Sequence, residues 1–228
     1  MELISNLNAL DWLRSLPKES VDLIVTDPPY ESLEKWRNIG TKARLKSNWF
    51  PVIPNSLFPE LLEAFDYVLK PNSHCYLFCD AETMFTIKPM IDASGFKFWK
   101  PLVWDKKKIG MGYHYRARYE FILFFEKGKR KLKNFSMSDV FEFPKINNGY
   151  PTEKPVELAE QLIEQSTEPG NLVVDPFCGS GAFGVAAIQK GRRFLGNDLQ
   201  EEAVSLSRQR CLAAHKTSSL GEAEGTTT

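Results

Sequence analysis

The sequence predicts an α/β fold in which a mostly parallel sheet is covered by helices on both faces. Three observations support this prediction. Strand-like and helix-like segments alternate along the chain, two apolar runs end in Asp-Pro, and a glycine loop joins the second run to a helix. The 228 residues suffice for one sizeable core but are short for two domains. We therefore expect a single domain over residues 1–215 and a small, polar, disordered tail over 216–228.

Hydrophobic periodicity gives the order of the elements. Buried strands are expected at 2–6, 21–26, 75–79, 98–104, 119–126, 171–174 and 193–198. Helices are expected at about 57–69, 83–93, 156–166, 182–190 and 202–214, with a short one between the first two strands. Segments 35–54 and 127–151 have no clean period, and we interpret them as insertions in the domain.

The tetrapeptide Asp27-Pro28-Pro29-Tyr30 closes the apolar run 21–26. Its two prolines fix φ and donate no N–H, so the backbone is stiff and its carbonyl groups are left as acceptors. A carboxylate and an aromatic face beside such a turn can hold a flat ring that bears an amine. A plain strand-to-loop turn is the alternative, because short motifs also occur by chance.

A second segment, 171–181, predicts a buried strand that runs into a glycine loop, Asp175-Pro176-Phe177-Cys178-Gly179-Ser180-Gly181. Glycines let the backbone approach a ligand and supply N–H donors near a helix N-terminus. The next strand ends in Asp198, and this order is typical of a nucleoside site in which the acid binds the ribose hydroxyls. Because the spacing is not G-x-G-x-x-G, an adenosine-type cofactor is favoured over a dinucleotide.

Taken together, these segments resemble the S-adenosylmethionine-dependent DNA amino-methyltransferases of the β class, in which the catalytic tetrapeptide precedes the cofactor loop. The resemblance covers residues 2–212. It implies a three-layer, Rossmann-like methyltransferase fold with circularly permuted motif order. It also implies a seven-stranded sheet with one antiparallel strand, in which strands 22–26 and 171–174 are neighbours.

The same resemblance implies roles for individual residues. The catalytic residues would be Asp27, Pro28, Pro29 and Tyr30. Contacts to S-adenosylmethionine would come from Asn8, Asp27, Lys154, Asp175, Pro176, Phe177, Cys178, Gly179, Ser180, Gly181 and Asp198. Tyr30 as a core residue and Lys154 as a surface lysine are the alternatives. Two positions depart from the family pattern: Asn8 replaces an acid that would touch the cofactor's adenine, and Tyr150 stands where His is common.

The implied reaction is methyl transfer to the exocyclic 6-amino group of adenine in duplex DNA after base flipping. Asp27 and the carbonyl of Pro28 would each accept one amine hydrogen, and Tyr30 would stack on the flipped base. Relatives acting on cytosine usually carry Ser in place of the acid, so Asp27 favours adenine. The alternatives are a cytosine 4-amino methyltransferase, an RNA amino-methyltransferase and a non-catalytic nucleic-acid binding module on the same fold.

Formal net charge is zero, but basic residues cluster near the expected base pocket. Such runs are usually a solvated face. Because we expect them to flank the pocket, we assign them to the DNA backbone instead. The candidates are Lys35, Arg37, Lys42, Arg44, Lys106, Lys107, Lys108, Arg116, Arg118, Lys129, Arg130 and Lys131. The insertions 35–54 and 127–151 would recognise the DNA site, and a homodimer that shares this task is a hypothesis.

The four cysteines, Cys75, Cys79, Cys178 and Cys211, form no C-x-x-C pair and no metal-ligand cluster with the three histidines. We therefore expect reduced thiols, no metal and a cytoplasmic location in a bacterial or phage-infected cell, in a restriction-modification setting. No apolar run is long enough to cross a membrane, and no secretory segment opens the chain.

Overall fold

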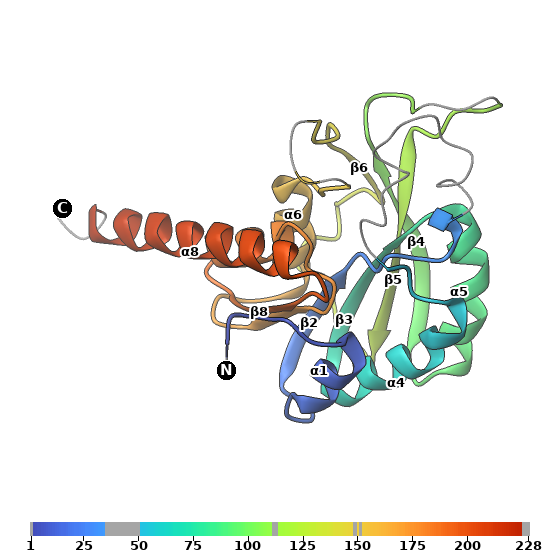
Figure 1. The fold of residues 1–228 in the computed structure, drawn as a ribbon, viewed down its shortest axis with the longest axis horizontal. Coiled ribbons are helices and arrows are strands. Elements are labelled where there is room, and N and C mark those ends of the chain that lie inside the picture. Colours follow the sequence, from blue (N-terminus) through green and yellow to red (C-terminus); the bar gives the residue numbers. More distant parts are fainter. Residues whose placement is uncertain (1, 35–50, 111–113, 148–149, 151, 225–228) are drawn as a thin grey trace.

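The computed structural model describes residues 2–34, 51–110, 114–147, 150 and 152–224. They form one eight-stranded sheet in the order β1-β8-β7-β2-β3-β5-β4-β6. The strands are β1 (Ile4–Ser5), β2 (Val21–Thr26), β3 (Leu69–Cys79), β4 (Lys97–Asp105), β5 (Tyr119–Lys127), β6 (Val140–Glu142), β7 (Leu172–Asp175) and β8 (Arg193–Asn197). Figure 1 shows the helices around them: α1 (Ala9–Ser15), the single turn η1 (Asn55–Leu57), α4 (Phe58–Val68), α5 (Ala81–Ala93), α6 (Val156–Ser166), α7 (Ala182–Gln189) and α8 (Glu201–Glu224).

The fold class expected from the sequence is confirmed. Only β5 runs against its neighbours; every other pair of adjacent strands is parallel. Strands β2 and β7 are neighbours although nearly 150 residues separate them, with Leu23 opposite Val173. The sheet has eight strands rather than seven, because β6 pairs with β4 as the outermost strand on that side. This three-residue strand lies inside the segment 127–151 that we expected to be irregular, and it is too short to give a period-2 signal.

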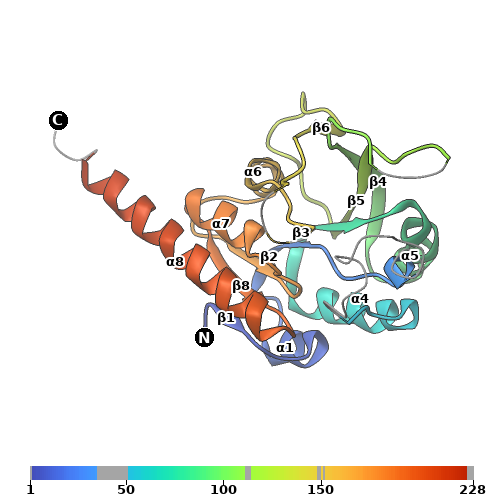
Figure 2. The same ribbon diagram turned by 45° about the horizontal axis from the view of Figure 1, so that its top comes forward.

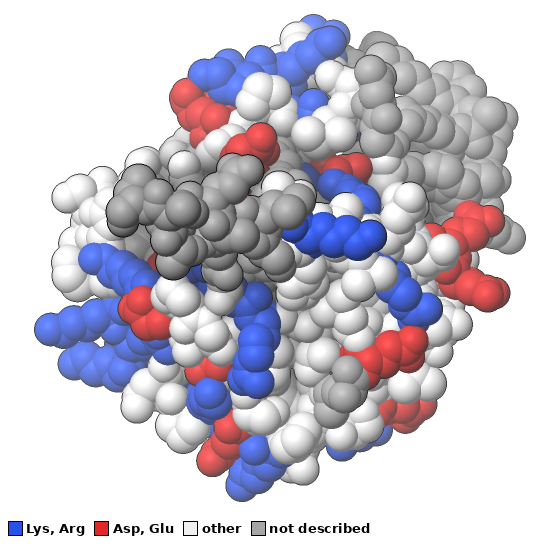
Figure 3. Space-filling model, turned by 90° about the vertical axis from the view of Figure 1, so that its left-hand side faces the viewer, with Lys and Arg blue, Asp and Glu red and all other residues white. Residues whose placement is uncertain are grey.

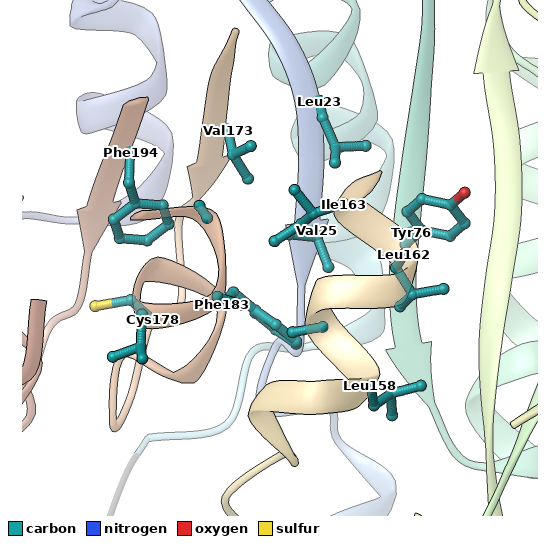
Figure 4. Close-up of a cluster of buried hydrophobic side chains, with 14 of the residues drawn as sticks. Leu23, Val25, Tyr76, Leu158, Leu162, Ile163, Val173, Cys178, Phe183 and Phe194 are labelled. Carbon is teal, nitrogen blue, oxygen red and sulfur yellow. The ribbon is translucent and has the colours of Figure 1, made fainter. Parts of the chain in front are cut away.

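Helices cover both faces of the sheet (Figure 2). On one face, Leu23 and Val25 of β2 belong to a buried cluster with residues of α6, α7 and α8, and Figure 4 shows both side chains on the side of the strand where Ile163 of α6 lies. On the other face, α1, α4 and α5 pack against Val21 and Ile24 of the same strand. Strand β2 is buried along its whole length, which explains its nearly continuous apolar sequence.

Helix α8 extends to Glu224 and projects from the rest of the molecule (Figures 1 and 2). We expected a disordered tail from residue 216; the structure gives residues 216–224 as part of this helix, and the disorder stays a prediction. Among the described side chains of this helix, Ala214 is the last that belongs to the buried core. Beyond that point the helix is held by its own hydrogen bonds, among them one from Thr217 Oγ1 to the carbonyl of Ala213.

The ends of the strands form two opposite edges of the sheet, and strand direction decides which end lies at which edge. The carboxyl ends of β2, β3, β7, β8 and β4 share one edge, and the antiparallel β5 begins there and ends at the opposite edge. Ligands of open α/β sheets bind at the carboxyl edge. Among the described residues, no helix combines the length and hydropathy needed to span a bilayer.

Candidate active site

A cavity of about 380 Å³ opens at the carboxyl edge of the sheet. Its walls include the whole tetrapeptide 27–30, the loop residues Asp175 to Ser180, and Asp198. Two segments separated by almost the whole chain thus face one space, as the sequence predicts. Gly181 does not line the cavity but begins helix α7 directly behind it, as the N-cap residue.

The tetrapeptide is fixed from both sides of the turn. Thr26 Oγ1 donates to Asp175 Oδ1 at 2.6 Å, which ties the end of β2 to the end of β7. The carbonyl of Pro29 accepts from the N–H of Ile53 at 2.8 Å, and Tyr30 forms an isolated parallel bridge with Ile53. Tyr30 is buried among side chains of α4 and also lines the cavity, so the core and pocket interpretations both hold. Burial, helped by nearby carboxylates, raises the pKa of its phenol well above the usual value.

A row of four charged side chains lies beside the catalytic turn. Lys154 is almost fully buried, forms an ion pair with Asp27, and lies 3.5 Å from Glu120 Oε2. Lys106 in turn donates to Glu120 Oε1 at 2.5 Å and lies over the ring of Trp104. The alternative of a surface lysine at Lys154 is therefore wrong. Its direct partner is Asp27, while its contact to a cofactor stays a prediction.

Burial and charge act against each other in this row. Burial raises the pKa of Asp27 although Lys154 opposes the shift. Burial also works to raise the pKa of Glu120, but Lys154 and Lys106 outweigh it and the pKa is lowered. For Lys154, burial disfavours the charged form, yet Asp27 and Glu120 prevail and its pKa is raised.

The glycine loop adopts backbone angles that only glycine takes without strain. Gly179 and Gly181 have φ of 48° and 78°. A Cβ on Gly181 would lie 2.7 Å from Cβ of Ser207 on α8, so loop and helix are in direct contact. The thiol of Cys178 is buried, lies 3.5 Å from Ser207 Oγ, and has a pKa raised by that burial. Its side chain therefore packs behind the loop.

Two carboxylates frame the loop. Asp198 accepts from the N–H of Gly179 and the N–H of Gln200, each at 2.9 Å, and its burial raises its pKa. Asp175 Oδ1 accepts from Thr26 and from the N–H of Phe177. Its other oxygen, Oδ2, is buried and has no hydrogen-bond partner among the described residues. Burial raises the pKa of Asp175 to about 8.

These features fit an adenosine-type ligand with a charged tail. Asp175 lines the cavity and keeps one buried carboxyl oxygen unpartnered, and Asp198 lies where ribose hydroxyls are expected. Leu7, Phe177 and Leu199 supply apolar wall around these acceptors. Asn8 also lines the cavity, but its amide oxygen accepts from the N–H groups of Leu10 and Asp11 as the N-cap of α1. Its expected contact to adenine therefore shares that oxygen with the helix.

The comparisons with known proteins decide the family. A family model described as DNA methylase, covering N6 and N4 methyltransferases, matches residues 21–209. This chain belongs to the DNA methylase family. The match confirms the enzyme class and the cofactor type expected from the sequence, because the residues it spans include the tetrapeptide and the glycine loop.

Curated relatives span nearly the whole methylase. The Type II methyltransferase M.HhaII of Haemophilus parahaemolyticus is 26% identical over 204 residues, covering 86% of this chain and 90% of the relative. The DNA adenine methyltransferase YhdJ of Escherichia coli (strain K12) is 28% identical over 253 residues, covering 91% and 82%.

Solved structures share the fold of the methylase. An M1.HpyAVI–SAM complex superposes with a TM-score of 0.68 at 24% identity, covering 92% of this chain and 100% of that one. PvuII DNA methyltransferase (cytosine-N4-specific) superposes with a TM-score of 0.73 at 17% identity, covering 94% and 91%.

Two site residues of the methylase were missed from its sequence. Glu120 forms an ion pair with Lys154. Arg210 of α8 forms an ion pair with Glu153 at 2.8 Å and donates to the carbonyl of Ser180 at 3.0 Å. Glu120 is one of only two acids between Lys106 and Lys133, at the start of a strand, and that position was a usable signal. Arg210 gave no such signal in the sequence, because single arginines are common on the exposed faces of helices. Tyr150 lines the cavity beside Gly179, and burial raises its pKa to about 12.

The predicted DNA-binding residues divide into three groups. Lys106, Lys107, Lys108, Arg116 and Arg118 follow β4 or precede β5, at the same edge of the sheet as the cavity. Lys107 pairs with Glu142 and Arg118 pairs with Asp105, whereas Lys108 and Arg116 are exposed. Lys35, Arg37, Lys42 and Arg44 lie outside the described residues.

The third group is misplaced in the sequence-based prediction. Lys129, Arg130 and Lys131 follow the end of β5, and Lys127 lies opposite Ser73 at the beginning of β3. These three residues are therefore at the opposite edge of the sheet and do not flank the cavity. The error arose because β5 is antiparallel, so its two ends lie a strand length apart. Over the face drawn in Figure 3, basic and acidic side chains alternate, with a run of basic ones at its upper end.

Clusters of side chains that could bind a metal ion are absent from the described part of the chain. No group of three or more His, Cys, Asp or Glu side chains within it could hold a metal ion. All four cysteines are buried and free of disulfides.

Proposed function

We propose that this DNA methyltransferase transfers a methyl group from S-adenosylmethionine to the 6-amino group of adenine in duplex DNA. The observation that carries the proposal is the single cavity onto which Asp27 and the glycine loop both open. An acceptor for an amine and a cradle for an adenosine moiety are thereby within reach of one another.

The residues that would hold the cofactor are the loop 175–181 and Asp198, with the unpartnered oxygen of Asp175 as a further polar contact. S-adenosylmethionine supplies an electrophilic methyl group on a positively charged sulfur. Phe177 and Leu199 give this part of the cavity an apolar wall.

Asp27 prepares the target amine. An exocyclic ring amine is a poor nucleophile because its lone pair is delocalised into the ring. By accepting one amine hydrogen, Asp27 favours a pyramidal nitrogen whose lone pair is free. The carboxylate also lies beside the positive charge that develops on nitrogen, so it stabilises the transition state more than the ground state.

The base must leave the duplex to reach this cavity. Flipping costs a few kcal/mol in lost stacking and pairing. Tyr30 lines the cavity beside Asp27, and stacking on an aromatic ring returns about 1–3 kcal/mol per base.

Adenine is favoured over cytosine by the acid in the tetrapeptide and by the relative YhdJ, which is described as a DNA adenine methyltransferase. The cytosine-N4-specific fold neighbour makes the 4-amino group of cytosine the second candidate. Incubation with labelled cofactor and unmodified genomic DNA, followed by nucleoside analysis, separates the two. We expect N6-methyladenine; N4-methylcytosine would replace the adenine assignment.

Parallel reactions with duplex RNA and with DNA test the remaining alternatives. Label in RNA alone would favour an RNA amino-methyltransferase. Binding of DNA with no label in any nucleic acid would favour a non-catalytic module. We further propose that two copies share recognition of the DNA site, and sedimentation of a fully active monomer would refute this.

A further inference from the structure

The ion pair between Asp27 and Lys154 is part of a row of four charged side chains. The four side chains Asp27, Lys154, Glu120 and Lys106 alternate in sign and come from four distant parts of the chain. Asp27 follows β2, Lys154 precedes α6, Glu120 is on β5, and Lys106 follows β4. Their charges cancel as a set, which allows Lys154 to be buried among three partly buried partners.

Lys154 is held from several directions. Its ammonium group contacts Asp27 Oδ2 on one side and Glu120 Oε2 on the other, and donates to the carbonyl of Thr152 at 3.3 Å. It also lies 5.4 Å from the centre of the Phe78 ring. Glu120 is itself fixed by Lys106 at 2.5 Å. Lys154 therefore has little freedom to leave Asp27 for another partner.

We propose that Lys154, held in place by Glu120 and Lys106, is a positioning residue that keeps Asp27 ionised and occupies one of its two carboxylate oxygens. The second oxygen is then the acceptor for the target amine. This inference rests on the proposed function, and it assigns Lys154 to the catalytic acid rather than to the cofactor.

Other ionisable groups around Asp27 contribute little charge near neutral pH. Tyr30 and Cys79 face it, and burial raises the pKa of both groups well above neutrality. Asp175 also faces Asp27 from the end of β7, and its pKa of about 8 keeps it largely protonated. The charge state of Asp27 is thus set by two opposing pairs of influences: burial and Glu120 favour the neutral form, whereas Lys154 and Lys106 favour the ionised form.

The test is the pH dependence of kcat at saturating DNA and cofactor. Lys154→Met removes the attractive charge, so the acidic limb should move to higher pH by about 1–3 units. Glu120→Gln removes a repelling charge, so the same limb should move to lower pH. Opposite shifts are expected only if both side chains act through the ionisation of Asp27. Lys154→Arg, which keeps the charge, should restore the limb toward its wild-type position.

A matched control exists on the same strand. Lys70 pairs with Asp22 of β2 at 2.7 Å, at the opposite edge of the sheet from the cavity. Lys70→Met removes a comparable lysine–aspartate pair and should leave the acidic limb unmoved. Binding of S-adenosylhomocysteine, measured by calorimetry, should be unchanged within about twofold in Lys154→Met.

Three results would overturn the inference. One is an active Lys154→Met enzyme with an unmoved limb. Another is a shift in the same direction for Lys154→Met and Glu120→Gln. The third is loss of S-adenosylhomocysteine binding in Lys154→Met, which would return Lys154 to the cofactor site. If Lys154→Met does not fold, Glu120→Gln decides by its direction alone. A wild-type chain that methylates no DNA would instead refute the proposed function.

Discussion

At the scale of single residues, the surroundings of Asp27 explain how a buried carboxylate acts as an acceptor. It has one strong cationic partner, Lys154, and it lines the cavity. Burial alone would favour its neutral form, which donates where the reaction needs an acceptor.

We expect Asp27→Asn to lower kcat by about 10²–10³-fold, the loss typical of removing one preorganised electrostatic group. The amide keeps the shape of the side chain but not its charge, so binding of DNA and S-adenosylhomocysteine should persist. Single-turnover methyl transfer measures the chemical step. A variant with more than a tenth of wild-type activity would contradict the proposed role.

At the scale of elements, the contact between the glycine loop and α8 determines how the loop is held. Gly181 has a left-handed φ and no space for a Cβ against Ser207. Arg210 from the same helix donates to the carbonyl of Ser180. The loop is therefore fixed by a helix from which α7 and β8 separate it in sequence.

Gly181→Ala tests this contact, and Gly170→Ala is its control. Gly170 has a similar φ of 81° but nothing within 4 Å of an added Cβ. Both variants bear the backbone strain of about 1–3 kcal/mol. Only Gly181→Ala adds overpacking, so it should be less stable by a further ~1–3 kcal/mol in denaturant unfolding. Equal stabilities would show that the loop and helix adjust freely.

A second inter-element contact lies away from the cavity. His74 of β3 is fully buried, and its Nδ1 lies 2.8 Å from Ser166 Oγ at the end of α6. Tyr76 Oη lies 2.8 Å from the same oxygen, and His74 Nε2 lies 3.1 Å from the carbonyl of Arg130. Burial lowers the pKa of His74, so folding favours the neutral form of this ring.

This shift makes stability depend on pH. Below about pH 6.5 the unfolded chain binds a proton at His74 more readily than the folded chain does, so His74 costs stability as pH falls. Relative to His74→Gln, the wild type should lose stability between pH 7 and pH 5. The difference between the two proteins is the quantity to measure, because Asp175 changes stability in the opposite direction. A constant difference across this range would exclude the effect.

At the scale of the whole molecule, the direction of one strand decides which basic residues can meet DNA bound at the cavity. Lys108 and Arg116 are exposed at the cavity edge, and Lys129 and Lys131 are exposed at the opposite edge. Both pairs carry the same charge, so they form a matched comparison.

Lys108→Ala with Arg116→Ala should weaken DNA binding and reduce the slope of log affinity against log salt by about 2, roughly one for each lost phosphate contact. Lys129→Ala with Lys131→Ala should leave that slope unchanged. Fluorescence anisotropy at several salt concentrations provides both slopes. A larger effect from the second pair would place the DNA on the other edge.

The sequence by itself determined the α/β class, the two turns that meet at the cavity, and the neighbouring positions of β2 and β7. These follow from local signals: apolar runs ending in Asp-Pro, glycines before a helix, and a recognisable order of motifs. The edge strand β6 was not visible because three residues carry no period.

Only the tertiary structure decided the partners of Asp27 and the location of the basic residues. Lys154, Glu120 and Lys106 lie far from Asp27 in sequence, and their meeting depends on strand order and on the reversed direction of β5. The same reversal carries Lys129, Arg130 and Lys131 to the far edge. Residue types and spacing record what a segment prefers locally, whereas burial and ion pairing depend on which segments the folded sheet brings together.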